Sequence, residues 1–394
     1  MARHRQAHRG RPARTVAIWV AMIAAAVAVG AIVGIAIGSP PGRTPSTSVA
    51  AGARSSAAGA SPRVHATASA NPTAVGQAPS STDPVASAAP DLPSSGGRFG
   101  LGLLIADRGN GRLLIVNDAG ATLWSFPAAH SLPAGQHFSA DDAFISPDHR
   151  TIVANDESHQ VIDVIDIATR RVIWQYGHYG VMGSALGYLH TPDDAYPLAN
   201  GNISVADIRN CRILEIDPAK RIVRRLGRAG RCTHHPPISF NNPNGDTPLP
   251  DGGLLVTEIG GSRVVRLGPA GNVVFDIHAP VLYPSDAQLN ARGNVLVVDY
   301  ARPGAVVELD PRGHVVWRYG PRSGPGMLDH PSLAIPLPDG TIALNDDYRH
   351  RVVVIDPRTN RIVWQYGHTG LAGRAKGYLF VPDGIDLVPL GTAL

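Results

Sequence analysis

The sequence has little cysteine and no helical periodicity in its C-terminal three quarters. It contains two cysteines, which excludes a miniprotein built on a disulfide framework and a cysteine-rich zinc module. Beyond residue 98 no stretch sustains a 3.6-residue hydrophobic period, which excludes a helical domain there. The overall composition also excludes collagen, a coiled coil and a fully disordered chain. The sequence contains no Cys-x-x-Cys, His-Glu-x-x-His or Gly-x-Ser-x-Gly motif, so no local motif indicates a redox, zinc-protease or serine-hydrolase centre.

Positive charge is concentrated in the N-terminal quarter. Residues 1–97 hold eight arginines and two aspartates, which leaves 27 basic and 29 acidic residues in the remainder. The folded part therefore lacks the charge that binding a polyanion requires, and we expect no nucleic-acid partner. The whole chain has two lysines against 33 arginines and much alanine, a usage typical of a GC-rich bacterial genome.

The N-terminus has the pattern of a membrane anchor. Residues 1–14 carry five arginines and no acid, and an uncharged run follows whose apolar heart is 16–37. A helix of 22 residues crosses a hydrocarbon core of about 30 Å. We therefore expect a cytoplasmic basic tail at 1–14 and a single transmembrane signal-anchor helix at 15–38, with the rest exported across a bacterial cytoplasmic membrane. A cleaved signal peptide is the alternative, although its apolar region is normally shorter.

Residues 39–97 are dominated by serine, alanine and proline. A segment of this composition cannot bury enough apolar area to offset its ordering entropy. We expect a disordered linker between the membrane and a folded domain at 98–394.

The folded domain repeats one unit six times. Residues 284–320 (PSDAQLNARGNVLVVDYARPGAVVELDPRGHVVWRYG), 331–367 and 141–177 are the clearest copies, with weaker ones starting near 193 and 242 and a truncated one at 98. Each copy reads as four short strands separated by turn residues. One acidic residue closes the second strand of every copy, at intervals of 41–51 residues: Asp107, Asp156, Asp207, Glu258, Asp299 and Asp346. Four antiparallel strands per unit predict an all-β, six-bladed β-propeller.

Two further features support the ring. The fourth strand carries an aromatic residue in five copies and an arginine in one, which we interpret as a packing position between blades: Trp124, Trp174, Arg224, Phe275, Trp317 and Trp364. The first unit lacks its opening strand, and residues 377–390 match the segment that opens the third unit. The C-terminal strand is therefore expected to close the first blade, and a closed ring has few free strand edges.

The repeat resembles known propeller families. The acid followed by a short loop and Arg-Val-x-x-Ile-Asp, best seen at Tyr348–Asp356, resembles NHL repeats, and the Val-Val-Trp-x-Tyr-Gly strand endings resemble bacterial arylsulfotransferase-like and quinoprotein-like propellers. The resemblance covers about 98–390 and implies a fold far more strongly than an activity.

Polar residues recur where the innermost strands begin, at the mouth of the central channel. The candidates are His190, Asp194, His235, Asn244, Asp286 and His330, with Asp142, Asp194, Asn244 and Asp286 as metal ligands. Converging oxygen ligands suit calcium, and adjoining histidines would suit another divalent metal, although a solvated channel mouth with no cofactor is the simpler interpretation. Some six-bladed lactonases and lyases hold a metal in this channel, so the resemblance also implies a metal-dependent enzyme. Arylsulfotransferases need a nucleophilic histidine, and no motif here selects one.

Two connections between blades share one pattern, Trp-Gln-Tyr-Gly-His-x-Gly-x-x-Gly-x-x-x-Gly-Tyr-Leu, at 174–189 and 364–379. They are interpreted as loops packed between blades or as a surface for a small molecule or partner. Cys211 and Cys232 fall in connections of the third unit on one face, and because export permits oxidation we predict a disulfide between them.

The sequence as a whole predicts a membrane-anchored, extracytoplasmic propeller that binds an unknown protein or small-molecule ligand on its loop face. The alternative is an extracytoplasmic enzyme, metal-dependent or arylsulfotransferase-like, with its site at the channel mouth.

Overall fold

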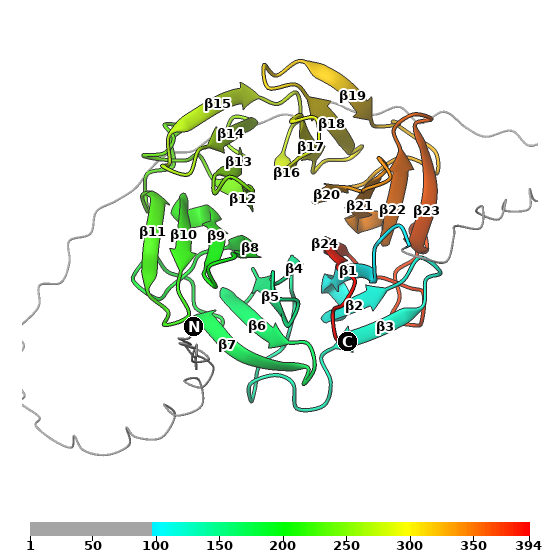
Figure 1. The fold of residues 1–394 in the computed structure, drawn as a ribbon, viewed down its shortest axis with the longest axis horizontal. Helices are drawn as coiled ribbons and strands as arrows, with labels where there is room; N and C mark the ends of the chain where they lie inside the picture. The colour runs from blue at the N-terminus through cyan, green and yellow to red at the C-terminus, as the bar shows by residue number, and fades with distance from the viewer. Residues whose placement is uncertain (1–96) are drawn as a thin grey trace, which may run out of the picture. The chain divides into compact units, whose positions relative to one another are not determined.

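The computed structural model describes residues 97–394, which form six sheets of four antiparallel strands around a central axis (Figure 1). We number the blades in the order of the repeats. From the axis outward, blade 1 contains β24 (Pro382–Val388), β1 (Gly102–Asp107), β2 (Arg112–Val116) and β3 (Thr122–Phe126). Blade 2 contains β4 (Ala143–Ile145), β5 (Thr151–Asp156), β6 (Val161–Asp166) and β7 (Arg171–Gly177). Blade 3 contains β8 (Pro192–Pro197), β9 (Ile203–Asp207), β10 (Arg212–Ile216) and β11 (Ile222–Gly227).

The other three blades follow the same plan. Blade 4 contains β12 (Pro243–Pro248), β13 (Leu254–Glu258), β14 (Arg263–Leu267) and β15 (Val273–His278). Blade 5 contains β16 (Pro284–Leu289), β17 (Val295–Asp299), β18 (Ala305–Leu309) and β19 (Val315–Tyr319). Blade 6 contains β20 (Ala334–Pro336), β21 (Ile342–Asp346), β22 (Arg351–Asp356) and β23 (Arg361–Gly367). One-turn 3-10 helices follow the second strand of blades 1, 3 and 6: η1 (Arg108–Asn110), η2 (Ile208–Asn210) and η3 (Asp347–Arg349). The prediction of an all-β, six-bladed propeller is confirmed.

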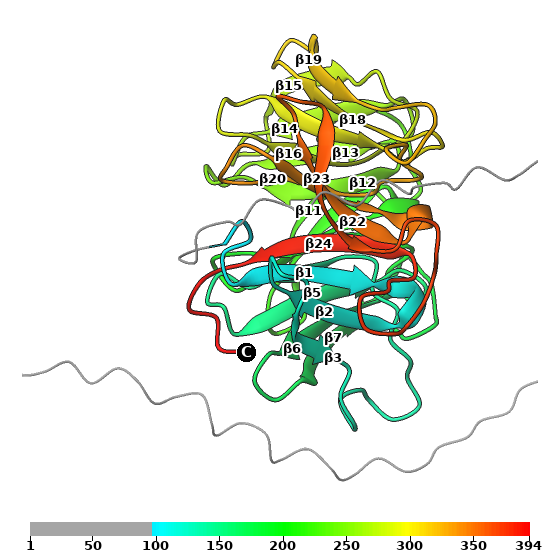
Figure 2. The same cartoon turned by 90° about the vertical axis from the view of Figure 1, so that its right-hand side faces the viewer.

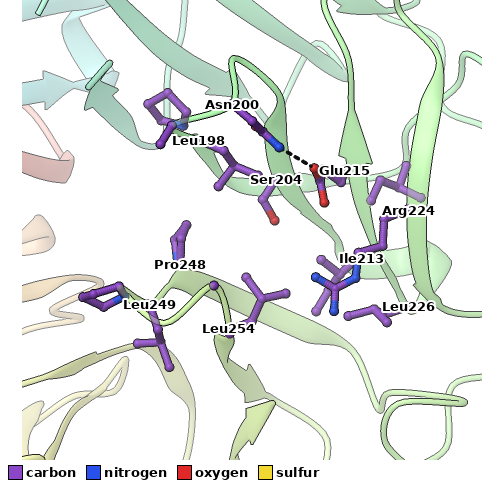
Figure 3. A pocket seen from close by; sticks show the side chains of 16 residues that line it. Leu198, Asn200, Ser204, Ile213, Glu215, Arg224, Leu226, Pro248, Leu249 and Leu254 are labelled. Carbon is purple, nitrogen blue, oxygen red and sulfur yellow. Dashed lines mark hydrogen bonds between the residues drawn. The ribbon is translucent and has the colours of Figure 1, made fainter. Parts of the chain in front are cut away.

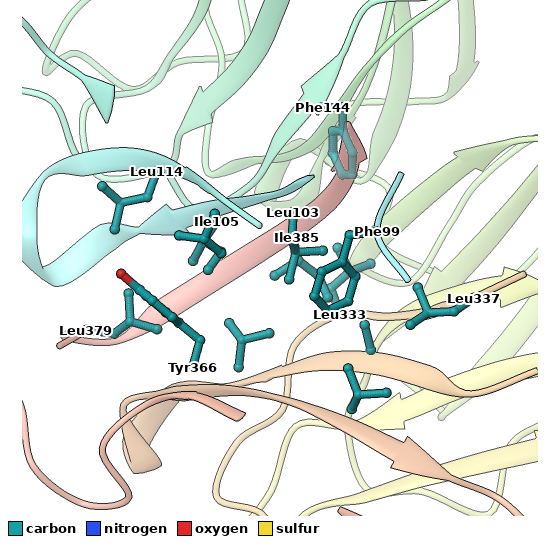
Figure 4. Close-up of a cluster of buried hydrophobic side chains, with 14 residues drawn as sticks. Phe99, Leu103, Ile105, Leu114, Phe144, Leu333, Leu337, Tyr366, Leu379 and Ile385 are labelled. Atoms are coloured by element: carbon teal, nitrogen blue, oxygen red, sulfur yellow. The ribbon is translucent and has the colours of Figure 1, made fainter. Parts of the chain in front are cut away.

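The C-terminal strand closes the ring as expected. β24 pairs antiparallel with β1, with Ile105 opposite Ile385 and Leu103 opposite Leu387, and the two strands run side by side in Figure 2. Ile385 then packs with Phe99 of the N-terminal segment and with Tyr366 of blade 6 in one buried cluster (Figure 4). The ends of the described chain are therefore held together by hydrogen bonds and by apolar packing.

The recurring acid fixes the connection that leads into each innermost strand. Oδ1 of Asp207 accepts the backbone N–H of His190 at 2.7 Å, while Oδ2 accepts Nε of the buried Arg212 at 2.7 Å. Equivalent backbone bonds run to the other five acids, from Phe380 to Asp107, Ser139 to Asp156, Asn241 to Glu258, Leu282 to Asp299 and Asp329 to Asp346. The repeated carboxylate thus has a structural role, since it accepts a backbone N–H of the connection at the channel face.

The tryptophan of the fourth strand ties neighbouring blades together, as expected of a packing position. Trp174 Nε1 donates to the carbonyl of Pro218 in the next blade at 3.0 Å, and Trp124 Nε1 donates to Ile167 at 2.9 Å. In blade 3 the position is Arg224, which reaches the carbonyl of Pro269 at 3.3 Å. Every one of these acceptors lies in the turn between the third and fourth strands of the following blade.

The structure tests the predicted disulfide but not the predicted N-terminal segments. Cys211 and Cys232 form a disulfide with Cα atoms 5.2 Å apart, which confirms the pairing. The basic tail at 1–14, the anchor at 15–38 and the linker up to residue 96 lie outside the described residues. No helix within 97–394 combines the length and the hydropathy needed to cross a membrane.

Candidate functional site

Two consecutive residues at the start of each innermost strand, or directly before it in blades 2 and 6, lie around the axis. In blades 3, 4 and 5 the pairing with the second strand shifts at this point, between Asp193 and Tyr196, Pro243 and Asp246, and Pro284 and Ala287. Successive side chains of a regular strand point to opposite sides, whereas a bulge lets two neighbours share one side. Asp194 adopts φ 46° within its bulge, a conformation that few non-glycine residues accept.

These residues make two rings around the axis. The first ring takes one residue from each blade: Asp141, Asp193, Asn244, Ser285, Ser332 and Asp383. The second ring takes the residue that follows each of them: Asp142, Asp194, Gly245, Asp286, Leu333 and Gly384. All of the first ring and the three aspartates of the second line a cavity of about 130 Å³ at the channel mouth, which we call the axial pocket.

A cluster of side chains from the innermost strands lies next to the lining of the axial pocket. Tyr196 of β8 stacks on Phe144 of β4 with ring centroids 3.8 Å apart, and its hydroxyl accepts a hydrogen bond from Gln288 of β16 at 3.1 Å. Ile335 of β20 and Leu387 of β24 pack into the same cluster. Side chains from five innermost strands therefore meet here, and Gln288 links them to the pocket lining, since it also donates to Asp286 at 3.0 Å.

The pocket is strongly acidic. Seven carboxyl groups line it: Asp141, Asp142, Glu157, Asp193, Asp194, Asp286 and Asp383. Arg108 is the one lysine or arginine in the lining, and its guanidinium lies 2.5 Å from Asp141, 2.6 Å from Asp383 and 3.2 Å from Glu157. Arg108 therefore neutralises acids on one side of the mouth only, where blades 1 and 2 meet.

Burial and mutual repulsion shape the pKa values of these acids. Burial raises the pKa of Asp142 and of Asp194 well above the usual range, and the neighbouring carboxylates of Asp194 and Asp286, respectively, raise them further. Burial and Glu157 raise the pKa of Asp193 to about 7. Burial alone would lower the pKa of Arg108, but Asp141 and Asp383 outweigh it and raise that pKa.

The candidate residues divide into two groups. Asp142, Asp194, Asn244 and Asp286 all line the axial pocket. The histidines do not join them: His190, His235 and His330 lie in the connections before the strands, outside the lining. His235 is exposed, and His330 Nδ1 lies 2.7 Å from Asp329 Oδ1, with its ring between Tyr300 and Tyr348. Leu333, where the polar pattern breaks, is buried in the core.

Sequence reasoning missed Arg108, Asp141, Glu157 and Asp193 in this pocket. A signal for the first ring was present, because a proline precedes the ring residue in five of the six blades: Pro192, Pro243, Pro284, Pro331 and Pro382. Aligning the units on this proline would have placed Asp193, and not only Asp194, at the axis. Arg108 and Glu157 reach the pocket from loops, where the repeated units cannot be aligned residue by residue.

Two loops that share one pattern form a second feature of the channel face. We call residues 178–188 the first twin loop and 368–378 the second. Arg212 donates to the carbonyls of Ser184 and Tyr188 in the first at 3.2 and 3.1 Å, and Asn210 donates to Gly183 at 2.8 Å. In the second, Arg112 donates to Arg374 and Tyr378, both at 2.9 Å, and Asn110 donates to Gly373 at 2.7 Å. Each loop is thus fastened to the next blade.

Inside each twin loop a histidine packs on a tyrosine. The His178 and Tyr188 rings are 3.9 Å apart, and the His368 and Tyr378 rings 4.1 Å. Gly183 is needed here, since a Cβ atom on it would lie 2.9 Å from the Tyr188 ring. The repeated glycines therefore serve packing, as one of the two interpretations held.

The twin loops differ in what they expose. Val181, Met182 and Leu186 of the first are 52%, 60% and 79% exposed. The second has Leu371, 59% exposed, at the first of these places, but Ala372 and Lys376 at the other two. One scaffold therefore presents an apolar tip in one copy and a more polar tip in the other.

A larger groove lies between blades 3 and 4, away from the axial pocket. It measures about 520 Å³ and is lined by apolar side chains that include Ile213, Leu226 and Leu254 (Figure 3). Arg224, which stands where four other blades have tryptophan, lies along its wall.

Comparison with solved structures shows the same architecture elsewhere. A protein of unknown function from Bacteroides caccae superposes with a TM-score of 0.52 and 17% identity over 72% of this chain and 97% of its own. A chain of a nidogen/laminin complex superposes with a TM-score of 0.50 and 14% identity over the same shares. At these identities the likeness establishes the fold alone. No curated protein matches the sequence.

A family model does match the sequence. It spans residues 158–377, more than half of the chain, and is described as "Outer membrane protein assembly factor BamB". The match agrees with the resemblance to quinoprotein-like propellers and gives no support to the NHL-repeat resemblance, since that is a different family. The chain therefore belongs to this BamB-like family of β-propellers.

Proposed function

We propose that this chain is a membrane-anchored, extracytoplasmic binding module that holds a partner protein on the channel face of its propeller, with the first twin loop as the main contact. The observation that carries the proposal is the exposed apolar tip of Val181, Met182 and Leu186 on a loop that Arg212 holds in place. Exposed apolar groups on a rigid support bind a partner without losing much conformational freedom.

The family supports a protein partner. Its description names an assembly factor for outer membrane proteins, and such a factor works by contact with other proteins. A propeller offers a rigid ring whose loops vary without disturbing the core.

Photocrosslinking tests the proposal, and the second twin loop is its matched control. A photoreactive phenylalanine analogue replaces Leu186 in one variant and Lys376, its counterpart, in another. We expect a discrete adduct in intact cells from position 186 and a weaker one or none from 376. The double substitution Met182→Ala/Leu186→Lys, which copies the second loop, should abolish an adduct formed from position 181. Equal adducts from both loops, or none from position 186, would contradict the proposal.

The membrane anchor needs its own test. We propose residues 15–38 as the anchor and 39–97 as the linker, with the propeller outside the cytoplasmic membrane. In Leu390→Cys, at a site 64% exposed, a membrane-impermeant maleimide should label the new thiol in intact spheroplasts, whereas a cysteine at position 8 should react only after lysis. Both proteins should stay with membranes washed in carbonate. Release of the Leu390→Cys protein would instead support cleavage of a signal peptide.

An enzyme with its centre at the channel mouth is the second candidate. The buried carboxyl groups favour it, because acids with strongly raised pKa values gather at catalytic sites. The lining of the axial pocket contains no histidine, which leaves the arylsulfotransferase-like version without a nucleophile there. Hydrolysis or elimination of a lactone or cyclic ester, abolished by Asp193→Asn, would support the metal-dependent hydrolase or lyase version.

A further inference from the structure

We propose that Asp142, Asp193 and Asp194 bind one calcium ion in the axial pocket. Carboxylate oxygens of these three residues lie within 4.8 Å of one another. Calcium, with bonds of about 2.3–2.6 Å, can join oxygens separated by up to about 5 Å, whereas the shorter bonds of magnesium require a tighter cluster. This site goes beyond the binding of a partner by the twin loops and does not depend on it.

An unpartnered buried oxygen gives the independent support. Asp194 is 2% exposed and lines the pocket, yet its Oδ2 atom receives no hydrogen bond from any residue in 97–394. A buried carboxylate oxygen without a donor is costly unless a cation compensates it. Asp286, its neighbour across the axis, differs because its two oxygens accept from Thr247 at 3.1 Å and Gln288 at 3.0 Å.

The residues around the three aspartates leave both room and charge for an ion. Gly245 stands between Asp194 and Asp286, and a Cβ atom at this position would lie 3.0 Å from a carboxylate oxygen of each. Arg108 pairs with Asp141, Asp383 and Glu157, and within the described part of the chain no basic side chain forms an ion pair with Asp142, Asp193 or Asp194. The inner carboxylates therefore have no protein counter-charge.

Neighbouring blades hold Asp193 in place, and the bulge of β8 orients Asp194. Asp193 accepts hydrogen bonds from Asn155 at 3.3 Å on Oδ1 and from Asn244 at 2.5 Å on Oδ2. The pairing shift in β8 directs Asp193 and Asp194 to the same side. Ligands fixed on strands lose little freedom when the ion enters, and water completes a calcium shell of six to eight oxygens.

Calorimetry on the full-length chain in detergent, freed of metal with EDTA, tests the site with calcium chloride as the probe. We expect one calcium per chain and a melting temperature several degrees higher with calcium. Asp142→Asn and Asp194→Asn should each weaken binding at least tenfold and reduce that shift. Asp163→Asn, which removes a buried acid outside the pocket, should bind as the unmodified protein does.

Two results would overturn the proposal. One is the absence of stoichiometric calcium binding at millimolar concentrations. The other is unchanged affinity in both pocket variants, which would show that calcium binds elsewhere or through the diffuse field of the seven acids. If Asp194→Asn failed to fold, Asp142→Asn would still decide the matter. Neither result bears on crosslinking from Leu186, so the two proposals fail separately.

Discussion

Trp364 donates its indole N–H to the main-chain carbonyl of Asp118 at 2.8 Å, and this bond joins blade 6 to blade 1 across the point where the ring closes. The same side chain packs edge-on against Phe99, with ring centroids 4.8 Å apart. The tryptophan pattern of the repeat therefore includes the junction between the last blade and the first.

Trp364→Phe keeps the aromatic packing and removes this hydrogen bond. We expect the free energy of unfolding to fall by about 1 kcal/mol, measured by urea denaturation followed by tryptophan fluorescence. Trp174→Phe removes the equivalent bond to Pro218 at an ordinary junction and should have a similar effect. A loss in Trp174→Phe with none in Trp364→Phe would show that the closing bond does not contribute.

Truncation of a side chain in the closing strand should destabilise the whole ring. Ile385 is fully buried between blades 1 and 6, so Ile385→Ala should lower the free energy of unfolding by about 2–4 kcal/mol in a single cooperative transition. Leu390→Ala is the control, since Leu390 is largely exposed and its loss should change stability by less than about 0.5 kcal/mol. An early separate transition in Ile385→Ala would mean that β24 detaches before the ring unfolds.

Removal of the disulfide should cause a measurable loss of stability, because the bond closes a loop between positions 21 residues apart in sequence. Cys211→Ser/Cys232→Ser is expected to lose about 3 kcal/mol of stability, mainly because the unfolded chain regains freedom. Dithiothreitol should lower the stability of the unmodified protein to a similar degree and leave the double variant unaffected. Equal stability of the oxidised protein and the double variant would contradict the prediction.

Asp163 gives a pH dependence with a defined sign. Burial raises the pKa of Asp163 to about 7 in the folded protein, and the charge of Asp156 raises this pKa further. A hydrogen bond from Gln175 and the charge of His159 lower it and offset only part of the effect of burial. Asp163 therefore leaves the free energy of unfolding unreduced below about pH 4, where the carboxyl is protonated in the folded and the unfolded protein. The free energy of unfolding falls as the pH rises through 7, where the buried carboxyl loses its proton. Asp163→Asn should be more stable than the unmodified protein by about 1–3 kcal/mol at pH 8, and the gain should vanish at pH 4.

The control for this pH profile is Asp148. A hydrogen bond from Ser146 lowers the pKa of this surface carboxyl, so Asp148→Asn should bring no gain at pH 8. Urea denaturation at both pH values measures each variant. A gain from Asp163→Asn that persists at pH 4 would show that packing, and not charge, is responsible.

Much of the fold could be predicted because each unit carries its own strand and turn signals. The acids from Asp107 to Asp346, the tryptophans and the duplicated segment at 377–390 specify the blades and their closure. Asp194 and Asp286 could be placed at the axis because they occupy equivalent places in the repeat, and Asn244 because it lies only one place earlier. Arg108 and Glu157 could not, because their positions depend on how loops of neighbouring blades fold over the mouth.

The sequence by itself determined the six blades, the disulfide and the twin loops, since periodicity, spacing and residue type are local properties of the chain. Only the tertiary structure decided that the histidines lie outside the axial pocket, that Tyr196 stacks on Phe144, and that Asp194 has an unpartnered oxygen. These features depend on distances between side chains from different blades. The repeat sets the order of those blades around the axis, but it does not set how far each side chain reaches across it.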